Sequence, residues 1–536
     1  FITVLCLSEA KGMRVFMKKK KVISCILAAV LAAGGQQVWA ATTHYNDSSA
    51  TGGSAEWNAY VEGWNSLAND YTHVSITPGA ADSQLNFAWY TEGAAATPVV
   101  YFGTDAGNLK PFTGSSGSVD TELTGGKAYS FSYVTVTGLE ENTTYYYSVN
   151  KNGVITQPEM YRTGSFENVN ILYVGDPQIG ASKGQPQGEG KLAADSGAAN
   201  TAARNDGFAW DRTLDIAIAQ HPDLNFVISA GDQVNKTGKP KEEEYAAYLS
   251  ASALKNLSVA TTIGNHDSLN PDYAYHFNNP NPTRLGATQA GGDYYYTYGS
   301  GLFIVLNTNN YNVAEHEQSI KKAVENFPDA VWRVVTIHQD IYGSGLDHSD
   351  TDGMILRTQL TPVFDRYDID VVLQGHDHTY SRSKILYGDG QTHNAYEFRL
   401  NGAGDDYDWD NAYNTGSGEK IPLYPGAEDA AGTAALEQFT GDNHCYTIES
   451  SGGNSVTNPK GTLYMTANSA SGSKYYELIS SQQDYIANRS QNWLPSYSVI
   501  NMTPSDFKIT TYQITDDGKV ETIDNTFTIH KTVSGR

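Results

Sequence analysis

Short runs of strand-forming residues recur beyond residue 168, and longer segments with helical spacing of apolar residues lie between them. The predicted strands are residues 169–174, 224–229, 259–263, 331–337 and 371–373. The predicted helices are residues 206–220, 242–254, 314–326 and 356–367. Strands that alternate with helices are typical of α/β domains, in which helices cover the faces of a sheet. Strand patterning returns at 461–466 and 497–529, and we expect these segments to complete the sheets.

The preceding segment has a different pattern. From about residue 69 to 165, short strands with alternating apolar and polar residues, such as 85–90 and 145–149, lie between glycine-rich turns. This pattern predicts an all-β sandwich. Tyr145 is spaced from Leu139 as in a tyrosine corner, where the ring hydroxyl bonds back to the chain. Residues 41–68 form an N-terminal extension, which we expect to pack on later structure through Trp57 and Trp64.

Residues 17–40 have the three parts of a signal peptide. Met17 and four lysines come first, an apolar run over 22–33 follows, and Val38-Trp39-Ala40 forms a small-x-small cleavage site. The run is shorter than the roughly 20 residues that a membrane-spanning helix needs, which favours a cleaved leader over an uncleaved anchor. We therefore expect residues 1–40 to be upstream residues and a signal peptide. The protein is expected to be secreted by a bacterial cell, with cleavage near Ala40.

The net charge limits which partners can bind, and the cysteine content limits which disulfides can form. The chain has 59 acidic and 35 basic residues and a net charge of −24, so its surface repels nucleic acids and anionic lipid headgroups. Of Cys6, Cys25 and Cys445, only Cys445 lies beyond the leader, which excludes an intramolecular disulfide framework. We expect no nucleic-acid partner and, after cleavage, no membrane partner. The sequence leaves the oligomeric state open.

Five groups of candidate metal ligands follow the predicted strands. They are Gly175-Asp176-Pro177-Gln178, Gly231-Asp232, Gly264-Asn265-His266-Asp267, His338 and Gly375-His376-Asp377-His378. Residues just past the carboxyl ends of neighbouring strands converge on one crevice of an α/β sheet. Any one group alone is typical of an ordinary turn. All five at strand ends predict one shared site.

The mixture of residue types favours a pair of metal ions. Imidazole suits zinc and iron, whereas carboxylate and amide oxygens suit harder ions. Two cations about 3.5 to 4 Å apart need a bridging carboxylate, and they can clamp the attacking and leaving oxygens of a phosphoryl transfer. We expect Asp232 to be that bridge and Fe, Zn or Mn to be the metals.

In residues and order, these groups resemble the calcineurin-like metallophosphoesterases. The stretch GHDHTYSRS at 375–383 is similar to the purple acid phosphatase branch, whose members carry a fibronectin type III-like domain where this chain has its predicted sandwich. The resemblance implies an αββα sandwich, an α/β fold, over residues 166–536, with insertions at about 181–205 and 388–457. It implies a fibronectin or immunoglobulin-like β-sandwich over residues 69–165.

The resemblance also implies roles for the site residues. It gives one metal to Asp176, Asp232 and His378, and the other to Asp232, Asn265, His338 and His376. His266 is similar to the family histidine that contacts the phosphate and helps the leaving oxygen depart, with Asp267 as its expected orienting partner. His348 is similar to a substrate-contacting histidine, and a solvated loop histidine is the alternative.

Two positions depart from the family pattern. Gln178 stands where most of the superfamily has histidine, and Asn235 stands where purple acid phosphatases have a metal-binding tyrosine. An amide oxygen can still coordinate a cation, so Gln178 is the predicted ligand and Asn235 the alternative. Because an amide is a poorer donor than imidazole, we expect the first metal to bind loosely.

Together these features predict an exported dimetal phosphoesterase that acts on a small phosphoester. The expected reaction is hydrolysis of phosphomonoesters by in-line attack of a metal-bound hydroxide. Phosphodiesterase or nucleotidase activity on the same core is the alternative among enzymes. A catalytically reduced surface-binding protein, with one metal site lost, is the alternative outside them.

Overall fold

The computed structural model describes most of one compact unit, His44–Arg536. The described residues are 55–94, 96–182, 199–346, 348–349, 352–400, 402, 407–423, 425–450 and 453–532. The predicted signal peptide at 17–40 and most of the predicted insertion at 181–205 lie outside them. Within these ranges, no helix combines the length and the apolar character needed to cross a membrane.

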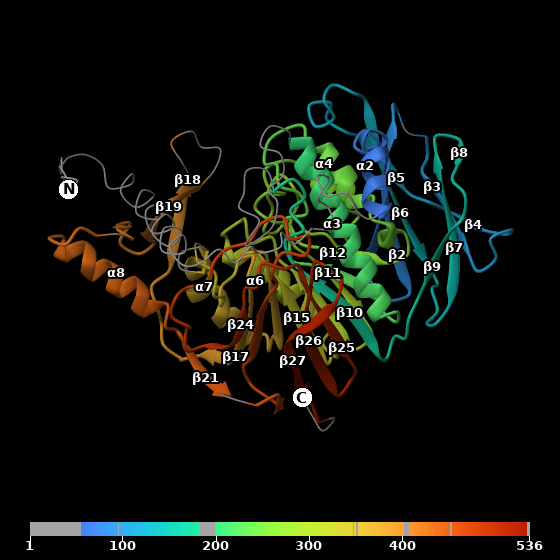
Figure 1. The fold of residues 1–536 in the computed structure, drawn as a ribbon. Coiled ribbons are helices and arrows are strands. Elements are labelled where there is room, and N and C mark those ends of the chain that lie inside the picture. Colours follow the sequence, from blue (N-terminus) through green and yellow to red (C-terminus); the bar gives the residue numbers. More distant parts are fainter. Residues whose placement is uncertain are drawn as a thin grey trace, which may run out of the picture. The chain divides into compact units, whose positions relative to one another are not determined.

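The N-terminal part begins with helix α2 (Ala55–Leu67) and continues as two small sheets (Figure 1). One sheet has the strand order β1-β2-β6-β5, and the other has the order β4-β3-β7-β8, with β9 also paired to β7. The strands are β1 Val74–Pro78, β2 Gln84–Glu92, β3 Val99–Gly103, β4 Lys110–Thr113, β5 Ser115–Ser118, β6 Tyr129–Thr137, β7 Thr144–Lys151, β8 Val154–Ile155 and β9 Glu159–Arg162.

Apolar side chains from both small sheets meet in one core, which includes Phe87 of β2 and Tyr147 of β7. Alternation of apolar and polar residues produces this arrangement, because one face of each strand is buried. The hydroxyl of Tyr145 accepts the backbone N–H of Glu140 at 2.7 Å, which is the back-bond expected from the sequence. In α2, Trp57 and Trp64 are buried, and the Trp57 ring packs edge-on against Phe208.

Two larger sheets form the centre of the second part. The seven-stranded sheet, in the order β12-β11-β10-β25-β26-β27-β22, consists of β12 Ser258–Thr261, β11 Phe226–Ser229, β10 Val169–Val174, β25 Ser496–Met502, β26 Asp506–Ile514, β27 Val520–His530 and β22 Ser455–Thr457. The eight-stranded sheet, in the order β13-β14-β15-β16-β23-β17-β21 with β24 paired to β17, consists of β13 Tyr294–Tyr298, β14 Gly301–Val305, β15 Trp332–Thr336, β16 Val371–Gln374, β23 Thr462–Thr466, β17 Tyr380–Gly388, β21 Tyr446–Ser450 and β24 Ile486–Ser490.

The strands that lead to the site are parallel and buried on both faces. β10, β11 and β12 pair in parallel in one sheet, and β14, β15, β16 and β23 do so in the other. All six residues of β10 are buried. Continuous apolar runs such as this one are typical of parallel strands covered on both sides. One face of each sheet packs against the other sheet in a shared apolar core.

Helices cover the two outer faces. The helices are α3 Ala199–Gln220, α4 Glu242–Leu249, the 3₁₀ helix η1 Ser252–Lys255, α5 Asp272–His276, α6 Val313–Asn326, α7 Asp352–Arg366 and α8 Ala430–Asp442. Residues of α3 and α4 share a core with the outer face of β10 to β12, and residues of α6 and α7 share one with the outer face of β14 to β16. The layers are therefore helix, sheet, sheet and helix, and the predicted αββα fold class is confirmed.

The segment predicted as an insertion at 388–457 is only partly separate. β18 (Tyr396–Leu400), β19 (Tyr407–Asn414) and β20 (Lys420–Ile421) form a small sheet, which packs with α8 around its own apolar cluster. In contrast, β21 pairs with β17, and β22 pairs with β27. The C-terminal end of this segment thus extends the two central sheets, a non-local pairing that local sequence patterns do not reveal.

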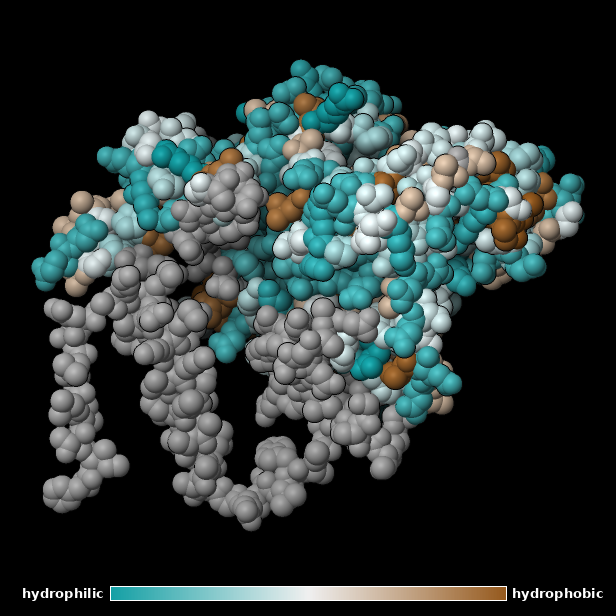
Figure 2. Space-filling model, turned by 90° about the horizontal axis from the view of Figure 1, so that it is seen from above, coloured by the Kyte–Doolittle hydropathy of each residue, from teal (hydrophilic) through white to brown (hydrophobic). Residues whose placement is uncertain are grey.

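Hydrophilic residues cover most of the described surface on the face drawn in Figure 2, where hydrophobic residues gather in small groups. The large apolar side chains that are exposed among the described residues are Val154, Ile155, Met160, Tyr387 and Leu400. Three of these belong to the β8 and β9 region of the N-terminal sheets, and Leu400 lies at the end of β18.

Tyr173→Phe tests how the two central sheets are joined. The buried Tyr173 hydroxyl of β10 accepts the N–H of Gln374 (2.9 Å) and lies within bonding distance of the carbonyl oxygens of Gln374 and Met465 (2.9 Å for Met465), all in the opposite sheet. Removing it leaves these buried backbone groups without this partner, so the free energy of unfolding should fall by about 1–3 kcal/mol in urea denaturation. Tyr512→Phe, in the partly buried ring of β26, is the control and should change little. Equal losses for both variants would contradict the role of the bonds across the sheets.

Candidate metal centre

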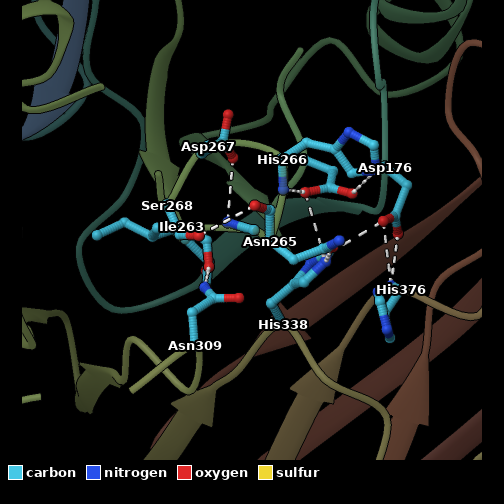
Figure 3. Close-up of polar contacts among 12 residues, drawn as sticks. Asp176, Ile263, Asn265, His266, Asp267, Ser268, Asn309, His338 and His376 are labelled. Atoms are coloured by element: carbon cyan, nitrogen blue, oxygen red, sulfur yellow. Dashed lines mark hydrogen bonds and ion pairs between the residues drawn. The ribbon is translucent and has the colours of Figure 1, made fainter. Parts of the chain in front are cut away.

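The five predicted groups lie in five loops that follow parallel strands of both central sheets. Asp176 follows β10, Asp232 follows β11 and Asn265 follows β12. His338 follows β15, and His376 follows β16. The carboxyl ends of the two sets of strands meet at one edge of the sheet pair. Figure 3 shows the side chains of Asp176, Asn265, His338 and His376 converging there. The candidate ligands therefore lie together at the carboxyl ends of the parallel strands, as the sequence pattern predicted.

Three buried side chains form a group with the spacing of metal ligands. One ligand atom from each of Asp232, His338 and His376 lies within 4.8 Å of the others. Asp176 lies beside this group, with its Oδ1 4.0 Å from His338 Nδ1 and 3.6 Å from His378 Nε2. Its carboxylate also accepts the backbone N–H of His376 at 2.9 Å.

The orientation of the His338 ring supports a cation beside it. Its Nδ1–H donates to the carbonyl oxygen of Ala230 at 2.9 Å, which leaves Nε2 as the free nitrogen. Nε2 lies 3.0 Å from Asn265 Oδ1 and 3.5 Å from Asp232 Oδ1. Three groups that carry lone pairs thus face one another, and a proton or a cation must lie among them. A backbone carbonyl that fixes the other ring nitrogen is the usual support of a metal-bound histidine.

Several of these residues adopt a backbone conformation that is uncommon outside glycine. The φ angles are 44° at Asp176, 36° at Gln178, 48° at Asp232, 69° at His376 and 47° at His378. Left-handed φ values at non-glycine residues cost about 1–3 kcal/mol each and cluster at functional sites. The rigid strands on either side hold these loops in conformations that bring the ligand atoms together.

Two glycines of the motifs leave room for the ligands. A Cβ atom on Gly264 would lie 2.0 Å from Asp232 Oδ1, and one on Gly231 would lie 2.3 Å from His338 Nδ1. Gly231 also has φ +115°, which side chains rarely allow. These glycines therefore allow the backbone of one loop to approach the side chains of another.

Burial and charge perturb the titration of the cluster in opposite directions. Burial raises the pKa of Asp176 to about 8. Burial also disfavours the charged form of Asp232, but the positive charges of His338 and His266 hold its pKa well below the usual range. Despite burial, the carboxylates of Asp232 and Asp176 raise the pKa of His338 to about 9. The cluster stabilises positive charge at its centre, as a cation site must.

His378 is held in the form that binds metals. Burial first, and then the charge of Lys474, lower its pKa well below the ordinary value, so the ring stays neutral. Its Nδ1–H donates to the carbonyl oxygen of Lys474 at 2.8 Å, which leaves Nε2 facing Asp176. Neutral imidazole is the metal-ligating form of histidine.

Gln178 provides a second indication of a cation. Its side chain is fully buried, and neither its amide oxygen nor its amide nitrogen has a hydrogen-bond partner. Such orphaned polar groups are rare in folded proteins and indicate an ion or water beside them. The backbone of Asn235 accepts a bond from the His266 ring, and its N–H donates to Glu244 at 2.9 Å. These observations support Gln178 as the predicted ligand and give Asn235 a supporting role for His266.

The expected pairing of Asp267 with His266 is wrong. The Asp267 carboxylate accepts the N–H of Gly264 at 3.0 Å and the side-chain amide of Gln233 at 2.8 Å. The His266 ring instead uses Nδ1 to donate to the carbonyl oxygen of Asn235, because the turn directs the two neighbouring side chains apart. Asp267 therefore stabilises the loop. The Nδ1 bond of His266 leaves Nε2 of the same ring 3.9 Å from Asp232 Oδ2.

His348 lies against the metal cluster. Its ring is 3.8 Å from the His376 ring between centroids, and its Nε2 bonds with the Tyr476 hydroxyl at 3.1 Å. The carboxylate of Asp377 holds the loop, because it accepts the N–H of Ser344 at 3.1 Å and also bonds with Ser349. This placement differs from that of a solvated loop histidine.

A sixth loop, 467–478, borders the site and was not predicted. It follows β23, which pairs in parallel with β16, and it carries Lys474 and Tyr476. Its serines also tie the β10 loop in place, because Ser469 Oγ donates to the carbonyl oxygen of Asp176 at 3.0 Å. The loop contains no His or Asp, so only its position after a parallel strand could have identified it.

A chelator titration of Gln178 variants tests the first metal position. Gln178→His should tighten that metal because imidazole is the better donor to zinc or iron, and Gln178→Ala should weaken it. The second metal, assigned to Asn265, His338 and His376, should stay in place. Metal stoichiometry during the titration is the measurement. Superimposable curves for the wild type and both variants would show that Gln178 is not a ligand.

Comparisons with known proteins agree with this geometry. Residues 169–380 match the calcineurin-like phosphoesterase family model, and residues 71–167 match the model of the purple acid phosphatase N-terminal domain. The structure is similar to a purple acid phosphatase from yellow lupin (Lupinus luteus) seeds, with a TM-score of 0.56 and 14% identity over 86% of this chain and 75% of that one. At this identity, the likeness shows the fold.

Curated relatives share only a short segment. Two uncharacterized proteins of Mycobacterium tuberculosis, from strains CDC 1551 and H37Rv, are each 39% identical over 57 residues, which is 11% of this chain and 11% of theirs. The two family matches cover both parts of the fold in the order that the structure shows. The chain thus carries a calcineurin-like phosphoesterase domain, which follows a purple acid phosphatase N-terminal domain.

Proposed function

We propose that the protein hydrolyses phosphomonoesters with two metal ions that share Asp232. One observation carries this proposal: Asp232, His338 and His376 present ligand atoms within 4.8 Å of one another in a buried site. The phosphoesterase domain supports the reaction class. The choice of monoesters, the metal dependence and the in-line reaction are our inferences.

The donor set suits two cations on either side of Asp232. Asp176, Gln178 and His378 would hold the first with Asp232, and Asn265, His338 and His376 would hold the second. When bound, such cations lower the pKa of water and neutralise the oxygens of a phosphoryl group. The protein contributes a fixed geometry, since backbone carbonyls orient both His338 and His378.

His266 is suited to assist the departing alcohol. Its Nδ1 bonds with the carbonyl oxygen of Asn235, so Nε2 is directed into the site, where its side chain keeps 21% exposure beside the buried Asp232. The buried Lys241 also donates to the His266 carbonyl at 3.1 Å and pairs with Asp272 at 3.4 Å, which fixes the turn. Because Nδ1–H is committed to Asn235, Nε2 carries a proton only when the ring is cationic. Burial lowers the pKa of this ring, while the charge of Asp232 favours the cationic form, from which Nε2 can pass a proton to a substrate oxygen.

His348 is suited to contact the phosphoryl oxygens from the opposite loop. Tyr476 fixes its Nε2, and the ring stacks near His376. With His266 after β12 and His348 after β15, imidazoles reach the site from both central sheets. Fixed donors of this kind stabilise charge that develops during phosphoryl transfer.

Asp232→Ala tests the shared ligand. Because Asp232 would contact both cations, this variant should lose both metals and fall to background hydrolysis of nitrophenyl phosphate, while its circular dichroism spectrum stays unchanged. The wild type should prefer nitrophenyl phosphate to bis(nitrophenyl) phosphate. Asp329→Ala, at an exposed position, is the control and should keep both metals. Wild-type activity in Asp232→Ala would refute the dimetal proposal, and a preference for the diester would favour a phosphodiesterase.

His266→Ala tests the role of this ring separately from metal binding. The variant should retain its metals and lose about 10²- to 10⁴-fold in turnover, the usual contribution of a general acid. His444→Ala removes a ring that is 63% exposed and should have no effect. If His266→Ala releases metal, His266 is part of the metal coordination and not a proton donor.

A further inference from the structure

A cavity of ≈ 320 Å³ opens beside the metal ligand Asn265. Its walls come from the loop after β12, from the segment 287–289, from residues 309–310 after β14 and from the ends of β18 and β19. In Figure 3, Asn309 lies on the opposite side of Asn265 from His376. The cavity thus leads away from the metal centre, in a direction that the alcohol part of a bound phosphoester can take.

Among the described residues, the lining is polar but uncharged. Eleven described residues form it, and none is Asp, Glu, Lys, Arg or His. Four are carboxamides, namely Asn265, Gln289, Asn309 and Asn310. In a chain with 59 acidic residues, an uncharged lining next to the site limits what can bind there. A carboxylate or a second phosphate would find no cation in the lining, whereas hydroxyl groups would find hydrogen-bond partners.

The wall near the metal centre is rigid. Asn309 is 6% exposed, and its amide donates to the carbonyl oxygen of Ile263 at 2.8 Å and accepts from Gln339 at 2.9 Å. Asn310 donates to the carbonyl oxygen of Ala287 at 3.0 Å, which ties two segments of the wall together. A wall fixed by its own bonds presents a preformed surface to a ligand.

The outer wall adds an apolar contact. Leu400 of β18 and Tyr407 of β19 are cross-strand partners, and Leu400 is 59% exposed. The Tyr407 ring packs edge-on against Tyr311 with centroids 5.3 Å apart, so its position is fixed. An apolar wall opposite carboxamides matches a sugar, which has hydroxyl groups at its edges and C–H groups on its faces. The volume lies at the small end of the roughly 300–1,000 Å³ range of ligand pockets and suits one such ring.

We propose that this cavity binds the alcohol part of the substrate and selects a neutral, polyhydroxylated alcohol of monosaccharide size or smaller. The inference rests on the proposed function and adds the substrate class to it. The phosphoryl group would lie at the metal centre, and Asn265 would mark the boundary between the two subsites. Gln289, exposed at the rim, would contact the far end of the alcohol.

A pair of substrates that differ in one group tests whether the cavity selects a neutral alcohol. Glycerol 3-phosphate and 3-phosphoglycerate differ only at the end far from the phosphate. This end is a hydroxymethyl group in glycerol 3-phosphate and a carboxylate in 3-phosphoglycerate. The metal-loaded wild type should show at least about tenfold higher kcat/KM for glycerol 3-phosphate, because the cavity offers no counter-charge. Glucose 6-phosphate should also be hydrolysed. Acetyl phosphate, whose leaving group is small, serves as the reference for the metal centre.

A rim variant makes the test specific to the cavity. Gln289→Lys should shift the ratio of the two kcat/KM values towards 3-phosphoglycerate by about fivefold, the effect of one partly exposed ion pair, and leave acetyl phosphate hydrolysis unchanged. Gln157→Lys makes the same change at an exposed position of the N-terminal sheets and should leave the ratio unchanged. An equal change of this ratio in both variants, or no change in Gln289→Lys, would overturn the proposal that the cavity binds the alcohol part of the substrate.

A binding measurement separates this inference from the proposed function. Saturation-transfer NMR with methyl glucoside should give a signal with the wild type and a weaker one with Ala287→Phe, which adds a ring at the cavity wall. A wild type that hydrolyses acetyl phosphate without preference between the glycerol compounds would overturn only the substrate class. A metal-loaded wild type that hydrolyses none of these esters would overturn the proposed function, and the substrate class with it.

Discussion

The buried carboxylates Asp176 and Asp232 set the main constraint on this molecule. Both lie almost without solvent contact at the edge where the two central sheets meet, and the charge of Asp232 acts on Asp176. Buried like charges are unfavourable unless positive charge lies beside them. The histidines on the loops around them contribute part of that charge, and the orphaned amide of Gln178 indicates an ion or water beside the two carboxylates. The surrounding loops are arranged to meet this requirement.

The sheets supply the rigidity that the loops need. Strands such as β10 are buried on both faces, and the Tyr173 hydroxyl joins β10 to the opposite sheet. With the strand ends fixed, the loops can hold Asp232 and His376 in left-handed conformations that are unfavourable in isolation. The fold thus stabilises a site whose local geometry is strained.

Much of this arrangement could be predicted from the sequence, because strand-end positions depend on local patterns. β10 has the predicted bounds, and the five ligand groups do follow parallel strands. Adjacency in sequence was a poor guide to side-chain partners, as the separate directions of His266 and Asp267 show. The placement of His348 depends on packing against His376 and Tyr476, which no local pattern encodes.

Non-local pairing accounts for the other differences. β21 and β22 come from a stretch that reads as an insertion, yet each pairs with a distant strand. Lys474 borders the site on a loop without His or Asp, so the residue types of that loop gave no signal. The same stretch that carries β21 and β22 also supplies Leu400 and Tyr407, which face the cavity beside Asn265. Variation in this segment can therefore change the substrate while the metal centre stays the same.

Anomalous X-ray scattering from crystals grown with zinc or manganese tests the central claim most directly. The account predicts two anomalous peaks about 3.5 to 4 Å apart, with a carboxylate oxygen of Asp232 in contact with both. The first peak should lie beside Asp176 and Gln178, and the second beside Asn265 and His338. A single fully occupied peak, or two peaks that do not share Asp232, would contradict the account.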